Sequence, residues 1–93
     1  MKAEMGAFEW DDSKAEANFA KHGLDSIDVA ASFTGLGFTR FARTGDETRF
    51  QTFLMMEGRL ISVIWTPRPG RIRLISARRA KRNEKAKFGA SFS

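Results

Sequence analysis

The residues best suited to chemistry in this sequence are arginines, and they gather in its last third. Between residues 68 and 87 nine basic residues stand against a single acid, Glu84. Arginine stays charged at any working pH, and its planar fork can hold two phosphate oxygens at once. Such residues on a rigid sheet could bind a phosphodiester and stabilise its transition state, or could form a solvated or docking face. The candidate substrate-binding residues are Arg68, Arg71, Arg73, Lys81 and Arg82, and Arg68, Arg78 and Arg79 are candidate catalytic residues.

Two further groups could move a proton. Glu47 and Arg49 stand two residues apart, so on a strand they would share a face, either as a base held by a cation or as a surface ion pair. His22, preceded by Lys21, carries the side chain that titrates near neutral pH. His22 also stands at the expected end of a helix, where its role could be structural. We therefore add Lys21, His22, Glu47 and Arg49 to the catalytic candidates.

The residue types that are missing narrow the chemistry. The chain has no cysteine and one histidine, which excludes disulfides, thiolate metal sites and a multi-histidine metal site within one chain. It has no phosphate-cradling glycine loop and no dinucleotide fingerprint, so we expect no cofactor and no bound metal. Hydrolysis would then use a nucleophile of the substrate, which RNA has in its 2′-hydroxyl and DNA lacks. The net charge is +5, which favours an anionic partner such as nucleic acid. No apolar run is long enough to span a membrane. The absence of cysteine fits a reducing compartment, and we therefore expect a cytoplasmic protein.

The helices and strands that must position these residues can be predicted from the spacing of apolar residues and from residue types that begin or end helices. Ninety-three residues predict one domain, 1–93, with a frayed tail at about 90–93. Asp11, Asp12 and Ser13 are residue types that cap helix starts, and the spacing of Ser13 and Glu16 predicts a capping box. Gly23 predicts the end of that helix, with Phe19 in its buried stripe. Asp25 begins a second helix, which the segment 34–37 ends.

Strand signals occupy the middle of the chain. Residues 8–10 indicate a short edge strand, and residues 57–58 indicate a tight hairpin. The remaining strands are expected at 38–43, 50–56, 60–66 and 71–76, and a last helix at 77–88. Because the strand connections are short, we predict the α+β class: a compact antiparallel sheet flanked by two N-terminal helices and one C-terminal helix.

Several motifs together resemble a known family. The segments are 8–11 (FEWD), 21–23 (KHG), 47–49 (ETR) and 73–80 (RLISARRA), with Lys14, Asn18, Arg68 and Glu84. In combination they resemble the BrnT family of toxins. The resemblance implies a fold like that of RelE-type ribonuclease toxins and cleavage of RNA. It also implies a ribbon-helix-helix antitoxin partner of the BrnA type, a heteromeric complex with it, and binding of that complex to its own promoter DNA. Carried over by position, the candidates are Lys21, His22, Glu47, Arg49, Arg68, Arg73, Arg78 and Arg79.

Two positions depart from the family pattern. The family usually has a glycine a few residues after Glu-x-Arg, where this chain has Phe53 and Leu54, and it commonly ends the last helix with a tyrosine, where Phe88 stands here. Two hypotheses follow. The leading one is a toxin that cleaves RNA by attack of the 2′-hydroxyl and arrests growth. The alternative is a non-catalytic basic module that docks an acidic antitoxin and assists repression of promoter DNA.

Overall fold

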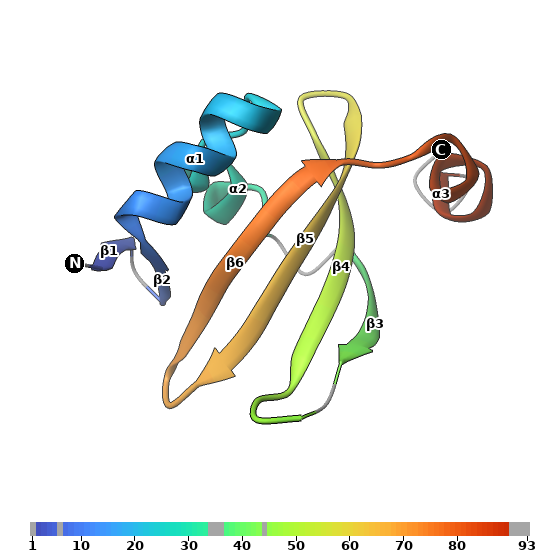
Figure 1. Cartoon of the computed structure of the whole chain (residues 1–93). Helices are drawn as coiled ribbons and strands as arrows, with labels where there is room; N and C mark the ends of the chain where they lie inside the picture. The colour runs from blue at the N-terminus through green and yellow to red at the C-terminus, as the bar shows by residue number, and fades with distance from the viewer. Residues whose placement is uncertain (1, 6, 34–36, 44, 90–93) are drawn as a thin grey trace.

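A six-stranded sheet lies at the centre of the molecule, with helices packed on both of its faces (Figure 1). The computed structural model describes residues 2–5, 7–33, 37–43 and 45–89. The strands are β1 (Lys2–Met5), β2 (Phe8–Asp11), β3 (Phe38–Arg43), β4 (Arg49–Met56), β5 (Arg59–Arg68) and β6 (Arg71–Arg79). The helices are α1 (Asp12–His22), α2 (Ser26–Ala31) and α3 (Arg82–Phe88). This arrangement confirms the α+β prediction, with two helices before the main strands and one after them.

The sheet is mixed rather than wholly antiparallel. Its order is β1-β2-β6-β5-β4-β3, and β2 runs parallel to β6 while every other neighbouring pair is antiparallel. The strand at Phe8 is therefore internal, between β1 and β6, and the prediction of an edge strand there was wrong. Short connections predict orientation only for consecutive strands. The chain leaves β2 through α1 and returns beside it more than sixty residues later, at Ile72 and Arg73.

The last strand is longer than predicted, and the last helix is shorter. Strand β6 continues to Arg79, and α3 begins at Arg82. Ala77 pairs with Val63, and Arg79 pairs with Ile61. The composition of 77–81 favours a helix, but the ladder with β5 and the burial of Ala77 outweigh that local preference. Arg78 and Arg79 consequently lie on a strand and not at a helix start.

Both N-terminal helices begin with an aspartate cap. Asp11, not Ser13, caps α1: its Oδ1 accepts a hydrogen bond from the backbone N–H of Lys14, at 3.0 Å. Asp25 caps α2 as predicted, and Gly23 ends α1 with a φ of 72°. Phe19 was expected in the core but is 55% exposed, because α1 turns Ala15 and Asn18 toward the sheet.

The β4–β5 connection is the tight hairpin predicted at 57–58. Glu57 and Gly58 both have positive φ, 52° and 76°, which suits the right-handed twist of the two strands. The predicted tail at 90–93 and most of the expected helix end at 34–37 lie outside the described residues. In the part of the chain that the structure describes, no helix is long and apolar enough to cross a membrane.

Alternating side chains give the sheet two different faces. One, here called the apolar face, packs against α1 and α2 through a core that includes Trp10, Val29, Ile61, Val63 and Leu74. The other, here called the polar face, carries the side chains of Glu9, Arg40, Gln51, Ser62, Thr66, Arg73 and Arg78. A second, smaller core lies at one end of the polar face, where α3 packs on β4 and β5.

Phe53 and Phe88, which both stand at positions that depart from the family pattern, meet in that second core. The rings of Phe53 and Phe88 stack, with centroids 4.4 Å apart and an interplanar angle of 21°. Phe53 is fully buried, and Leu60 and Ala80 complete the cluster. Phe88 thus anchors α3 by ring packing, which needs no phenol hydroxyl.

Candidate functional site

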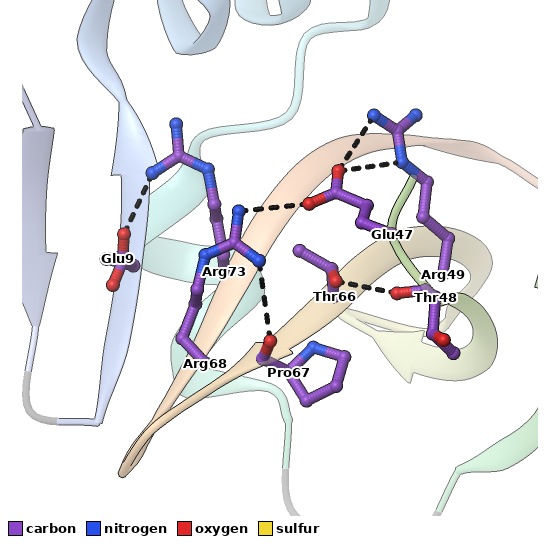
Figure 2. A network of polar contacts seen from close by, with 8 residues as sticks. All are labelled: Glu9, Glu47, Thr48, Arg49, Thr66, Pro67, Arg68 and Arg73. Carbon is purple, nitrogen blue, oxygen red and sulfur yellow. Dashed lines mark hydrogen bonds and ion pairs between the residues drawn. The ribbon is translucent and has the colours of Figure 1, made fainter. Parts of the chain in front are cut away.

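The carboxylate of Glu47 lies between two arginines at one end of the polar face (Figure 2). Its Oε1 accepts a hydrogen bond from Arg68 Nη2 at 3.0 Å. Its Oε2 accepts two from Arg49, from Nη2 at 3.1 Å and from Nε at 3.2 Å. The strand spacing predicted that Glu47 and Arg49 share a face, and the structure adds Arg68 from 21 residues away.

The backbone around Glu47 is fixed by a buried hydroxyl. Thr66 is 1% exposed, and its Oγ1 donates a hydrogen bond to the carbonyl oxygen of Thr48 at 2.6 Å. This bond ties the segment before β4 to β5, close to Arg68 (Figure 2). Glu47 therefore stands on a held segment although no strand includes it.

The two arginines also set the protonation state of Glu47. The hydrogen bond from Arg68, then that from Arg49, lowers the pKa of this carboxyl below its ordinary 4.5. Burial acts in the opposite direction and is outweighed. Glu47 is consequently a carboxylate throughout the neutral range, able to accept a proton but not to supply one.

Arg73 extends the cluster on the neighbouring strand. Its Nη1 donates to Glu9 Oε2 at 2.8 Å, and Glu9 is almost wholly buried. The parallel pairing of Glu9 with Arg73 brings the two side chains together. Glu9 was not a predicted site residue, although its position between Phe8 and Trp10 on a strand signalled that it faces away from the apolar core.

Arg78 lies further along β6 and forms a second ion pair. Its Nη1 and Nη2 donate to Glu84 Oε1 and Oε2 at 2.8 and 3.0 Å. Oε1 of Glu84 also accepts from the backbone N–H of Lys81, at 2.8 Å. The hydrogen bond from Arg78 lowers the pKa of Glu84 to about 2, and the hydrogen bond to Glu84 raises the pKa of Arg78 above its ordinary value. This pair holds the start of α3 on the end of β6.

Arg40 differs from the other arginines of this face, because neutral groups hold it. Its Nε donates to Gln51 Oε1 at 2.8 Å, and Gln51 Nε2 donates to Ser62 Oγ, also at 2.8 Å. The guanidinium carbon lies 5.4 Å from the ring centroids of Phe53 and Phe88. Arg40 was not among the site residues predicted from the sequence. It stands two residues after Phe38 on the expected strand, so alternation would have placed the two side chains on the same face.

Lys21 and His22 lie apart from this cluster. They form the last turn of α1, which packs against β2 and β6 on the other side of the sheet (Figure 1). Within the described residues neither makes a hydrogen bond or ion pair with a side chain of the polar face. Their role as proton carriers remains a prediction.

The other basic candidates are spread around the cluster. Arg71 pairs in register with Arg68 across the β5–β6 turn. Arg79 ends β6 and is exposed, and the equally exposed Lys81 and Arg82 form the start of α3. In the described part of the chain, no three side chains of metal-ligating type stand close enough to hold a metal ion.

Comparison with models of protein families gives a match over residues 10–84. The matching family is described as the ribonuclease toxin, BrnT, of type II toxin–antitoxin systems. The chain belongs to the BrnT family. The match spans α1 and every strand from β3 to β6, and it ends at Glu84, so it includes all the arginines of the polar face. No match was found among curated proteins or among solved structures.

Family membership gives the chain a functional setting. BrnT proteins are ribonuclease toxins, so RNA is the substrate class, and a type II system pairs the toxin with a protein antitoxin. The predicted membership of the BrnT family is thereby confirmed.

Proposed function

We propose that this BrnT toxin is a metal-independent endoribonuclease of the cytoplasm, in which the 2′-hydroxyl of RNA attacks the adjacent phosphorus at the polar face. The observation that carries this proposal is the carboxylate of Glu47 held between Arg68 and Arg49, with Arg73 on the next strand (Figure 2). A base and several cations on one sheet face are what such a reaction needs.

Glu47 acts as the proton acceptor in this scheme. Its lowered pKa keeps it ionised at neutral pH, so it can take the proton of the 2′-hydroxyl as the 2′-oxygen bonds to phosphorus. The bond from phosphorus to the 5′-oxygen then breaks, and that oxygen leaves with the electron pair and takes a proton from solvent water. The products are a 2′,3′-cyclic phosphate and a free 5′-hydroxyl.

The arginines bind the phosphate and stabilise its developing charge. A guanidinium has five N–H donors, and in this network Arg73 uses one of them on Glu9 while Arg49 uses two on Glu47. The remaining donors are available to phosphate oxygens, and the side chains of Arg68 and Arg49 are 36% and 29% exposed. The carboxylates fix the guanidinium groups before substrate arrives, so that little reorganisation is needed in the transition state.

Arg40 supplies uncompensated charge to the same face. Because its partners are the neutral Gln51 and two aromatic rings, its full positive charge can act on a phosphate of the bound strand. We therefore assign Arg40 to substrate binding rather than to proton transfer.

The partner in this scheme is a ribbon-helix-helix antitoxin of the BrnA type. The arginines of the polar face would bind its acidic residues and be blocked from RNA, and the heteromeric complex would bind its promoter DNA through the antitoxin. Covering a preformed cationic face is a direct way to neutralise a nuclease.

One observation favours a second candidate, the non-catalytic docking module. Arg49, Arg68, Arg73 and Arg78 each have a carboxylate partner, so the polar face carries less net charge than its arginines alone suggest. In that case the same pairs would open only to exchange partners with an acidic antitoxin.

Incubation of the purified chain with end-labelled RNA, with and without chelator, separates the two candidates. We expect cleavage that survives chelation, products with 2′,3′-cyclic phosphate ends, and none from a strand with 2′-deoxyribose at every position. Antitoxin binding without cleavage would support the docking module. Cleavage abolished by chelator and restored by added metal would contradict metal independence.

A further inference from the structure

A hollow beside α3 collects positive charge that no carboxylate of a described residue balances. It measures about 360 Å³ and lies between the β4–β5 hairpin, the end of β6 and α3. Arg59, Arg79 and Lys85 line it, together with Met55, Leu60 and two glycines. We name it the cationic hollow; none of the described residues that line it is acidic.

Its three cations differ from the arginines of the polar face. In the described structure Arg59, Arg79 and Lys85 have no ion pair, whereas Arg49, Arg68, Arg73 and Arg78 all do. All three side chains are exposed. Three like charges around one concavity repel one another, and an anion in the concavity relieves that repulsion.

The wall of the hollow limits what the anion can be. Met55 is 39% exposed and Leu60 is buried, so an apolar surface lies directly beside the cations. A methionine sulfur and an aliphatic side chain pack well against an aromatic ring. The volume lies in the range of small-ligand sites. A nucleotide has both required parts, a phosphate for the cations and a base for the apolar wall.

The hollow also continues the polar face. Leu60, which lines the hollow, belongs to the second core at one end of the polar face, and Lys85 directly follows Glu84 on α3. Arg79 directly follows Arg78 on β6, so its side chain leaves the strand on the other side, at the edge of this face. A single strand of RNA that lies across the polar face can therefore pass into the hollow at this end. A nucleotide carries a phosphate and a ring on one unit, whereas an acidic side chain has no ring to cover Met55, and this favours RNA over an acidic peptide as the occupant.

We propose that the cationic hollow binds one nucleotide of the RNA substrate away from the scissile phosphate, its phosphate on Arg59, Arg79 and Lys85 and its base against Met55. This inference rests on the proposed function for the identity of the ligand. The hollow lengthens the contact with RNA beyond the Glu47 cluster, and of its three cations only Arg79 was a candidate from the sequence.

The test is an anisotropy titration with fluorescent single-stranded RNA that carries 2′-O-methyl groups throughout. This probe has no free 2′-hydroxyl, so binding is measured without cleavage. The variants are Arg59→Ala and Lys85→Ala, and the control is Lys14→Ala, which removes one exposed positive charge from α1. Circular dichroism checks that all three fold.

We expect the two hollow variants to weaken binding by about 5- to 10-fold and to reduce the salt dependence by about one phosphate contact. Lys14→Ala should stay within about 2-fold of the native chain. Equal effects of all three variants would overturn the proposal, because the hollow would then contribute only general charge. Loss of antitoxin affinity in Arg59→Ala with unchanged RNA affinity would also overturn it and assign the hollow to the protein partner.

The two proposals fail separately. If the native chain cleaves ordinary RNA while Arg59→Ala and Lys85→Ala bind the probe like the native chain, only the hollow is wrong. If the hollow variants weaken binding but the native chain cleaves no RNA, the nuclease proposal fails and the nucleotide site stands. A native chain that binds no RNA contradicts both.

Discussion

The two faces of the sheet are built from the same strands but on opposite principles. The apolar face buries Ile61, Val63 and Leu74 under α1 and α2, and shape complementarity holds it together. The polar face buries Glu9, Gln51 and Ser62 beneath arginine side chains, and hydrogen bonds hold it together. Adjacent residues of one strand, such as Ile61 and Ser62, belong to different faces.

The contrast between the two faces separates the residues that stabilise the fold from those that serve function. Burial of apolar surface supplies most of the free energy of folding, whereas a buried ion pair returns little beyond its own desolvation cost. A small chain would gain more stability from apolar side chains at Arg73 and Arg78. Placing charged networks there instead is consistent with a surface that serves RNA and the antitoxin.

Truncation of neighbouring residues on β5 tests this separation with the largest expected effect. Ile61→Ala removes a fully buried side chain of the apolar face and should lower the free energy of unfolding by about 2–5 kcal/mol. Ser62→Ala removes the hydroxyl that accepts from Gln51 and should cost about 1 kcal/mol. Urea unfolding measures both. A Ser62→Ala variant as unstable as Ile61→Ala would mean that the polar face is also a main source of stability.

The Arg78–Glu84 pair gives the next effect, and it depends on pH. Because the folded pKa of Glu84 is about 2, below its ordinary 4.5, the pair stabilises the fold above pH 4.5 and loses its contribution as the pH falls toward 2. Glu84→Gln should therefore cost on the order of 2 kcal/mol at pH 7 and much less near pH 2.

Urea unfolding of Glu84→Gln at several pH values measures this contribution, with the exposed Glu16→Gln on α1 as control. The control should change stability by less than about 0.5 kcal/mol. A stability difference for Glu84→Gln that persists unchanged to pH 2 would contradict a role for the ionised pair.

Substitution of Arg40 tests whether a cation held only by neutral groups contributes to substrate binding. Arg40→Gln removes the charge that is not paired with a carboxylate and should weaken binding of uncleavable RNA by about 3- to 10-fold. Stability should change little, because the side chain is exposed. Fluorescence anisotropy measures the affinity, and an unchanged affinity would remove Arg40 from the binding face.

The smallest effect is expected at the end of α1. His22→Gln should reduce the single-turnover rate by less than about 3-fold, since His22 lies on the helix side of the sheet and outside the arginine network. A loss of about 100-fold or more would place the imidazole in the reaction and would show that α1 contributes to the site.

Local signals in the sequence predicted the elements well and their long-range pairing poorly. Gly23, Asp25 and the 57–58 hairpin were read correctly because each depends on a few neighbouring residues. The parallel placement of β2 beside β6 depends on tertiary packing between distant segments, which no local pattern encodes. The same reason explains the missed extension of β6 into a segment of helical composition.

The candidate site shows the same limit. Alternation predicted that Glu47 shares a face with Arg49. It could not show that Arg68 meets Glu47, that Glu9 meets Arg73, or that Arg40 rests on Gln51, because each contact joins two different segments of the chain. The family resemblance named most of the arginines but gave no partner for any of them.

The single-turnover cleavage rate of Glu47→Gln, measured against the native chain between pH 5 and pH 8 on one RNA, tests the account most directly. Gln keeps the shape but cannot accept the proton, so we predict a loss of about 100-fold or more. Because the pKa of Glu47 is below 4.5, the native rate should show no fall attributable to this base down to pH 5. A Glu47→Gln rate within about 3-fold of native, or a break near pH 6.5 as an imidazole base would give, would contradict it.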